Sequence, residues 1–272
     1  MPGGRAVGGV AGDACGLLES AMTVSVSDLL DITIDTHMDG ASPGLKGVVG
    51  IPEGHGPWPA VVVLHEAFGV DEEMRKQVAH LASLGYLALM PDLFTSGGMV
   101  KCIRSTMRAL QTGTGRAYRD IEAARLWLAA RDDTTPGIGA IGFCMGGGFA
   151  IMTVADFDVS AVNYGILPKD LDAAFEHSCP VVASYGGRDV TLRGATRKIE
   201  VAFTRHGVEH DVKEYPDAGH VFLNEKLTGP LWARPIMRVM NFGPRPASAA
   251  DAWHRIDTFL RAHLAPTHER KE

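Results

Sequence analysis

A glycine-rich turn at residues 142–148 constrains the fold of this chain more than any other feature. Its sequence, Gly-Phe-Cys-Met-Gly-Gly-Gly, stands between an apolar strand and a predicted helix. A side chain carried on so sharp a strand-to-helix turn has strained backbone angles, and its neighbours must be almost free of side chains. The turn also sets the sulfur of Cys144 at a helix N-terminus, where partial positive charge favours a thiolate. The pattern predicts a nucleophile elbow that carries Cys144.

Two residues that a nucleophilic cysteine needs follow later in the chain. Asp189 stands in a glycine-rich turn after the apolar stretch at 180–185, and His220 stands in a loop after the alternating stretch at 212–215. Taken singly, such an aspartate is most often a turn residue and such a histidine a surface residue. Three of them in the order nucleophile, acid, histidine, each at the end of a predicted strand, favour a catalytic triad on an α/β-hydrolase fold.

The chain resembles the dienelactone hydrolase family, whose members are cysteine-dependent α/β-hydrolases. The resemblance covers most of residues 27–264, and its motifs are HEAFGV at 65–70, PDLF at 91–94, GFCMGG at 142–147, and Asp189 with AGH at 218–220. It implies that Cys144 is the nucleophile, His220 the general base and Asp189 its orienting acid. Residue chemistry supports these roles independently, because a mostly protonated thiol needs a base, and an aspartate fixes the tautomer of that base.

The resemblance also implies roles around the triad. Glu66 matches a family glutamate that holds the resting thiol and accepts its proton when substrate arrives, and the backbone N–H groups of Ala67 and Met145 match the family's oxyanion hole. Glu66 follows the apolar stretch at 60–64, which places it at the C-terminal edge of a parallel sheet. The alternative for Glu66 is a loop or helix-start residue. We expect the neighbouring His65 to be structural.

The chain departs from the family at the substrate carboxylate. Dienelactone hydrolases proper hold that group with two arginines, whereas this chain has TSGG at 95–98 and Asn224 at the matching positions. The change to asparagine removes a charge and a bidentate fork, so the resemblance implies a neutral or less acidic substrate. Arg104, Arg108 and Arg116 are possible substitutes, but each fits a solvated surface better.

Further candidates for the substrate pocket are Phe68, Tyr164, Phe222 and Asn224. For Tyr164, packing in the core is the alternative. The segment at 226–243 predicts either an apolar wall or lid over the site or a part of the core, since it carries Trp232, Met237, Met240 and Phe242.

Strands and helices are predicted to alternate along the chain, which is typical of an α/β fold with a mostly parallel central sheet, flanking helices and an antiparallel start. We expect strands at 32–38, 45–51, 60–64, 86–90, 138–143, 159–164, 180–185 and 212–215. We expect helices after the elbow and at 71–84, 118–131, 191–205 and 248–264.

Residues 137–142, GIGAIG, match a dinucleotide-binding pattern, and Asp158 stands near the distance of a ribose-binding acid. That motif requires a strand before its first glycine, and we interpret 131–136 as a loop. The glycines are therefore assigned to the elbow strand. We expect no NAD, no other cofactor and no metal.

Length and net charge limit the number of domains and the classes of binding partner. A chain of 272 residues fits one large α/β domain. Its net charge of −6, with no basic run, gives no reason to expect nucleic acid or an anionic membrane as a partner. We expect a small-molecule ester or lactone substrate and a monomer or homodimer.

The cysteines and the N-terminus bear on location. Cysteines at 15, 102, 144 and 179 are widely spaced, and three remain once one is assigned to catalysis. A disulfide framework is therefore not expected, and a reducing cytoplasm fits better.

Residues 1–21 lack the apolar core of a signal peptide. We expect a disordered extension at 1–21, with Met22 as an alternative start, and a single domain at 22–272.

The sequence thus predicts a cytoplasmic hydrolase that cleaves an ester, lactone or thioester through an acyl-cysteine intermediate. An acyltransferase that uses the same acyl-enzyme is one alternative. A non-catalytic small-molecule-binding protein that reuses the pocket is another. A redox-sensing thiol protein fits least, because no resolving cysteine is adjacent.

Overall fold

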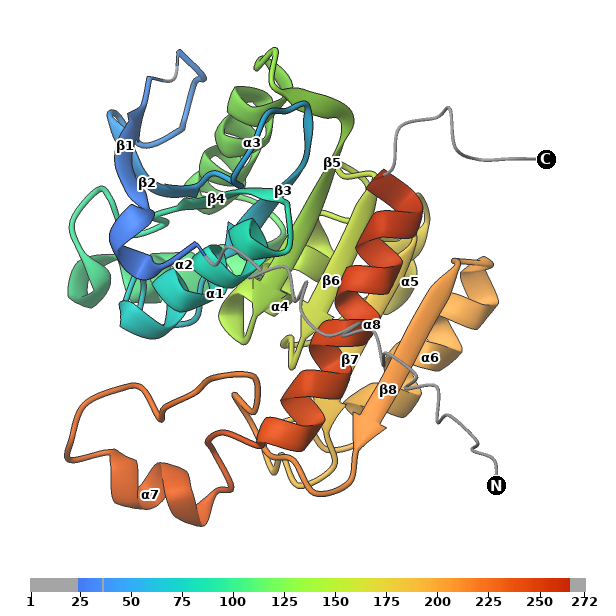
Figure 1. Cartoon of the computed structure of the whole chain (residues 1–272). Coiled ribbons are helices and arrows are strands. Elements are labelled where there is room, and N and C mark those ends of the chain that lie inside the picture. Colours follow the sequence, from blue (N-terminus) through green and yellow to red (C-terminus); the bar gives the residue numbers. More distant parts are fainter. Residues whose placement is uncertain (1–23, 36, 265–272) are drawn as a thin grey trace, which may run out of the picture.

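Eight strands form one mixed sheet in the computed structural model of the chain, which describes residues 24–35 and 37–264 (Figure 1). The strands are β1 (Leu30–Ile34), β2 (Leu45–Gly50), β3 (Trp58–Leu64), β4 (Leu87–Pro91), β5 (Thr134–Phe143), β6 (Val159–Asn163), β7 (Val181–Gly186) and β8 (His210–Tyr215). Their spatial order is β1-β2-β4-β3-β5-β6-β7-β8. The pairs β1–β2 and β2–β4 are antiparallel and the other pairs are parallel. The predicted mostly parallel sheet with an antiparallel start is confirmed.

Helices cover both faces of the sheet. One face is covered by α1 (Glu72–Ser83) and α8 (Pro246–Leu264). The other face is covered by α2 (Met99–Thr112), α3 (Arg116–Ala129), α4 (Met145–Met152), α5 (Leu171–Phe175) and α6 (Ala195–His206). Two short elements, the 3-10 helix η1 (Val26–Asp28) and α7 (Arg234–Val239), bury no residue, and Figure 1 shows the α7 segment standing away from the sheet.

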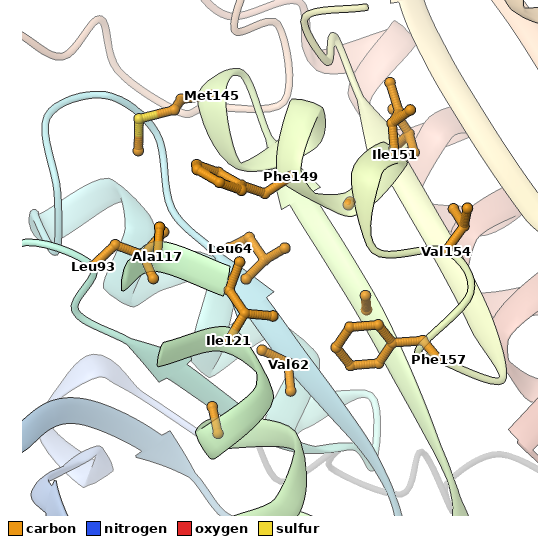
Figure 2. Close-up of a cluster of buried hydrophobic side chains, with 14 of the residues drawn as sticks. Val62, Leu64, Leu93, Ala117, Ile121, Met145, Phe149, Ile151, Val154 and Phe157 are labelled. Atoms are coloured by element: carbon orange, nitrogen blue, oxygen red, sulfur yellow. The ribbon is translucent and has the colours of Figure 1, made fainter. Parts of the chain in front are cut away.

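The central strand β3 shows why the two hydrophobic layers form. Residues 60–64 are a continuous apolar run with no exposed surface, as expected for a parallel strand covered on both faces. Because side chains alternate along a strand, Val62 and Leu64 join the layer under α3 and α4, whereas Val61 and Val63 join the layer under α1 and α8. Figure 2 shows the first of these layers, in which Val62 and Leu64 lie near Ile121 of α3.

The predicted strands and helices occur, with ends that shift by several residues. β1 ends at Ile34 rather than at 38. α6 begins at Ala195 rather than at 191, because Thr191 hydrogen-bonds the carboxylate of Asp189 and the following turn ends at Gly194, which has a φ of 70°. No helix among the described residues is long and apolar enough to span a membrane. The extension predicted at 1–21 lies outside the described residues.

The interpretation of 131–136 as a loop was wrong for its last three residues, because β5 begins at Thr134. The first glycines of the GIGAIG pattern, Gly137 and Gly139, lie inside this strand and not in a turn that opens a helix. A Cβ on Gly139 would lie 3.1 Å from Val159 and 3.2 Å from Leu264. This glycine thus lets α8 pack closely on the sheet, which is a structural role and not a phosphate-binding one.

Candidate active site

The elbow has the strained geometry that its sequence predicts. Cys144 joins β5 to α4 with φ 53° and ψ −111°, a left-handed conformation that is uncommon outside glycine. A Cβ on Gly142 would lie 2.1 Å from the carbonyl oxygen of Gly146, and a Cβ on Gly146 would lie 2.0 Å from that of Leu64. Two glycines are therefore needed, one to close the turn and one to bring it against the end of β3.

Three side chains meet at the C-terminal edge of the sheet. The Nε2 atom of His220 lies 3.0 Å from the sulfur of Cys144, and its Nδ1 atom lies 2.6 Å from a carboxylate oxygen of Asp189. The backbone N–H and the hydroxyl of Thr191 both donate to the other carboxylate oxygen of Asp189. The acid is thereby fixed, and its acceptor holds the imidazole with Nε2 toward the sulfur.

The charges of this group reinforce one another. Burial lowers the pKa of His220, but the negative charge of Cys144 and the hydrogen bond to Asp189 outweigh it, so the pKa lies above its usual value. Burial raises the pKa of Asp189, but the hydrogen bond and the positive charge of His220 outweigh it, so this pKa lies below its usual value. The arrangement favours a protonated imidazole beside the ionised carboxylate of Asp189.

Glu66 lies in the loop after β3 and is 2% exposed. Its carboxylate accepts hydrogen bonds from Nδ2 of Asn224, at 3.2 and 3.3 Å, and from the hydroxyl of Tyr164, at 3.3 Å. Burial raises the pKa of Glu66 to about 7, although the charge of His220 and both hydrogen bonds act against the shift. The sulfur of Cys144 points to the imidazole in this structure, so the resting contact between Glu66 and the thiol stays a prediction.

Asn224 stands where the resemblance leads us to expect an arginine, and its side chain is turned toward Glu66. Because an amide is neutral, it satisfies the carboxylate without cancelling its charge. Gln77 of α1 donates to the Asn224 amide oxygen at 3.5 Å and to the carbonyl oxygen of Leu223 at 3.3 Å. The sequence analysis did not single out Gln77. One feature of the sequence could have indicated it: Gln77 is a polar residue between Met74 and Val78, on the otherwise apolar face of a helix.

The backbone N–H groups of Ala67 and Met145 were predicted to form the oxyanion hole. Met145 is the first residue of α4, so the helix makes no use of its N–H group. Ala67 follows Glu66 in the loop after β3, and the elbow touches β3 directly at Leu64. The two N–H groups therefore start from neighbouring strand ends, as an oxyanion hole requires. That role stays a prediction.

His65 ties the site loop to the next strand end. The backbone N–H of Leu93 donates to its Nε2 atom at 3.1 Å, so its Nδ1 atom carries the proton and donates to the carbonyl oxygen of Glu66 at 2.7 Å. Burial lowers the pKa of His65, which favours this neutral form. The contacts fit the structural role that we expected.

The predicted pocket residues differ in their surroundings. Tyr164 is fully buried with its ring 5.2 Å from that of His220, and Phe222 is fully buried between Tyr164 and Tyr215. Phe68 is half-buried, and its ring packs on Gly229. Arg104 and Arg108 are exposed on α2, and Arg116 is exposed at the start of α3.

The segment at 226–243 contributes a wall on one side of the histidine. The ring of Phe242 lies 4.7 Å from that of His220. Trp232 is 78% exposed, so packing in the core is excluded for this side chain. Within the described chain, no group of three or more His, Cys, Asp or Glu residues is placed to hold a metal ion.

A mixed eight-stranded sheet, a cysteine on a strained elbow and a buried His–Asp pair at the same sheet edge define the α/β-hydrolase class. The model of the dienelactone hydrolase family matches residues 45–264. The chain belongs to this family, and it is a carboxylic ester hydrolase.

Relatives and solved structures agree with this assignment. A Methylorubrum extorquens protein named "Putative carboxymethylenebutenolidase" is 26% identical over 93% of this chain and 84% of its own length. The structure of P91, a dienelactone hydrolase-like promiscuous phosphotriesterase from metagenomic libraries, superposes with a TM-score of 0.71 at 21% identity, over 87% of this chain and 98% of that one. Esterase 2 of Thermogutta terrifontis superposes with a TM-score of 0.58 at 18% identity, over 89% and 98%. These structures share the fold.

Proposed function

We propose that the chain hydrolyses an ester, lactone or thioester through Cys144, His220 and Asp189, with an acyl-cysteine intermediate. The observation that carries the proposal is the 3.0 Å approach of the His220 Nε2 atom to the Cys144 sulfur, with a buried aspartate on Nδ1. A structural histidine gains nothing from facing a thiol on a strained turn. A base that must take the thiol proton requires this contact.

The first half of the reaction forms the acyl-enzyme. The sulfur of Cys144, having given its proton to His220, attacks the carbonyl carbon of the substrate. The N–H groups of Ala67 and Met145 stabilise the resulting oxyanion. The bond from carbon to the leaving oxygen or sulfur then breaks, and the leaving group takes the proton from His220 Nε2.

The second half releases the acid. A water molecule gives a proton to His220 and attacks the thioester carbon of the acyl-cysteine. The carbon–sulfur bond breaks, the carboxylic acid leaves, and the thiol regains its proton. Asp189 keeps the same imidazole nitrogen facing the reacting atoms in both halves.

Glu66 is proposed to accept the proton of the resting thiol as substrate enters and to pass it to His220, so that a single proton moves from the sulfur to the leaving group. At the end of the cycle the proton that water gave to His220 returns to the sulfur. The Glu66 pKa of about 7 supports the proposal, because a carboxyl group that titrates there exchanges a proton near neutral pH with little driving force either way. Its neutral partners Asn224 and Tyr164 hold both protonation states in place.

The proposed substrate is neutral or less acidic in its acyl part than a dienelactone. The support is Asn224, whose amide is turned to Glu66 and whose side chain carries no charge. A cytoplasmic location remains part of the proposal and rests on the cysteine count, with Cys102, Cys144 and Cys179 present as free thiols.

A panel of p-nitrophenyl esters, lactones and dienelactones, followed by intact-mass measurement, tests the function. We expect turnover of neutral substrates and a transient adduct of one acyl group, absent in Cys144→Ala. Acyl transfer to an added alcohol or amine that exceeds hydrolysis would instead identify an acyltransferase. Ligand binding with no turnover and no adduct would identify a binding protein.

A further inference from the structure

One stretch of this acidic chain is strongly basic. Residues 226–245 contain four cationic side chains and no aspartate or glutamate, whereas the whole chain carries a net charge of −6. The four side chains line a single pocket of about 470 Å³, together with Leu227, Phe242 and the turn at 243–244, and they are Lys226, Arg234, Arg238 and Arg245.

None of the four side chains forms an ion pair with another described residue. The charge of Lys226 contributes, after Lys76, to the lowered pKa of Glu225, and the backbone N–H of Lys226 donates to the Glu73 carboxylate at 2.9 Å. Arg234 donates through Nε to the carbonyl oxygen of Gly229, and Arg245 donates to the carbonyl oxygens of Asp217 and Pro244. The acids nearest in sequence are engaged elsewhere. Glu225 pairs with Lys76 at 2.7 Å, and the carboxylate of Asp217 accepts from Ser248 at 2.9 Å.

Like charges that share one cavity repel one another, and a bound anion removes that cost. A phosphate monoester carries about −1.5 to −2 charges at neutral pH, and its oxygens match the fork of a guanidinium group. A single carboxylate would leave most of the positive charge uncancelled. The charge of the pocket therefore suits one or more phosphate groups.

The pocket also adjoins the catalytic histidine. The ring of Phe242, which forms one of its walls, lies 4.7 Å from the ring of His220. The N–H of Gly243 donates to the carbonyl oxygen of His220 at 3.0 Å, and that of Arg245 donates to Phe222 at 3.1 Å. The pocket is thus attached by hydrogen bonds to the loop that carries the histidine, with one aromatic ring between them.

This location determines which part of a substrate would reach the pocket. In the proposed reaction, His220 protonates the leaving group, so the leaving group lies on the side of that ring. We propose that the pocket binds phosphate carried by the leaving group, so the substrate class is an acyl ester or thioester of a phosphorylated alcohol or thiol. The phosphate stays on the released alcohol or thiol, and only the acyl bond breaks. This assignment rests on the proposed function.

Binding of inorganic pyrophosphate to the whole chain tests the anion site without turnover. We expect saturable binding that weakens with salt and falls at least tenfold in the double variant Arg234→Gln/Arg238→Gln. Lys226→Gln is a second variant, for which we expect a smaller loss. Arg119→Gln, at an exposed arginine of α3, is the matched control and should bind like wild type. Absent binding, or equal binding in wild type and the double variant, overturns the proposal.

A pair of thioesters tests the substrate class. Butyryl-N-acetylcysteamine and butyryl-phosphopantetheine share their acyl group and differ in the phosphate. We expect kcat/KM at least tenfold higher for the phosphorylated thioester in wild type and in Arg119→Gln, and a ratio near one in the double variant or in 0.5 M salt. A wild-type ratio of one overturns the assignment.

Two further outcomes separate this proposal from its rivals. Pyrophosphate binding without cleavage of either thioester would reject the hydrolase mechanism and the substrate class together, while the anion site itself would stand. Cosedimentation with phosphatidylglycerol vesicles, combined with no affinity for pyrophosphate, would mean that the basic stretch meets a lipid surface, and would overturn the substrate pocket.

Discussion

Glu66 is an ionisable side chain that the fold buries beside neutral partners. An aspartate or glutamate at this depth usually faces a cation, which holds its pKa down. Here the hydrogen-bond partners are an amide and a phenol, and burial raises the pKa of Glu66 to about 7 although the charge of His220 acts against the shift. The carboxylate therefore changes its charge near neutral pH, and the effect should be visible in stability as well as in catalysis.

Glu66→Gln should change how stability depends on pH. Because the folded pKa of about 7 lies above the ordinary value of 4.5, the folded protein holds this proton more tightly, and the stability it gives is lost as pH rises through 7. Glutamine never ionises. We expect the variant to gain roughly 2–4 kcal/mol over wild type between pH 5 and pH 8. Urea unfolding at both pH values measures this, with Glu53→Gln as an exposed control. If the free energy of unfolding depended on pH in the same way in wild type and in Glu66→Gln, Glu66 would titrate normally.

Asn224 should also influence the pKa of Glu66. Asn224→Leu removes two hydrogen bonds that lower the pKa of Glu66, so the limb of the pH–rate profile that reports Glu66 should move to higher pH. Gln77→Leu acts only through Asn224 and should move the limb less. The measurement is kcat/KM against pH for a neutral ester. A lower rate with an unmoved limb in both variants would assign them a packing role only.

Cys144→Ala should abolish turnover and leave the fold intact, because alanine is smaller and fits the same backbone. Cys144→Ser should keep at most trace activity, since a hydroxyl is a poorer nucleophile than a thiolate with the same base. Steady-state rates and circular dichroism check both statements. Hydrolysis by the alanine variant at a wild-type rate would remove Cys144 from the mechanism.

At the scale of elements, the elbow depends on a contact between two backbones. A Cβ on Gly146 would lie 2.0 Å from the carbonyl oxygen of Leu64, so either the strand or the helix must move. We expect Gly146→Ala to lower the free energy of unfolding by about 3 kcal/mol or more. Gly137→Ala is the control, because its Cβ would meet Leu264 at 3.4 Å, an ordinary contact. Denaturant midpoints compare the two, and equal losses would contradict this account.

The elements that were predicted are those with strong periodicity. The apolar run of β3 and the helix α1 were both found within two residues of their observed ends. α2 was missed although its sequence is strongly amphipathic, with 3 of its 14 residues buried. Gly98 and Gly113, with φ of 75° and 72°, bound it and were the available signal. α7 was missed because it buries no residue, so no apolar face marks it.

At the scale of the whole molecule, the candidate site combines loops that follow β3, β5, β7 and β8. Motifs and strand order predict this meeting, because the C-terminal ends of parallel strands share one edge. They do not predict the contacts between the loops. That Asn224 would face Glu66, and that Gln77 would support it, depends on how α1 packs against the loop after His220. The asparagine at position 224 indicated that substrate recognition differs from the family pattern. It did not indicate which contacts the asparagine makes.

The replacement of an expected arginine by Asn224 predicts which charge the enzyme prefers in the acyl part of its substrate. A lactone that carries a carboxylate should have no higher kcat/KM than its methyl ester, because Asn224 offers no charge. An arginine pair would favour the acid by about 1.5–3 kcal/mol, roughly tenfold to a hundredfold. Rates for acid and ester at low and high salt decide the matter. A preference for the acid that fades with salt would mean that another arginine reaches the site.

The exposure of Trp232 gives this molecule a built-in optical reporter. Of the four tryptophans, Trp58, Trp127 and Trp253 are partly buried, whereas 78% of Trp232 is open to water. A collisional quencher such as acrylamide would therefore reach one indole before the others. Trp232 stands two residues before Arg234, so its fluorescence would change when an occupant binds to Arg234. Binding next to His220 could then be followed in real time, without a label and without a chromogenic substrate.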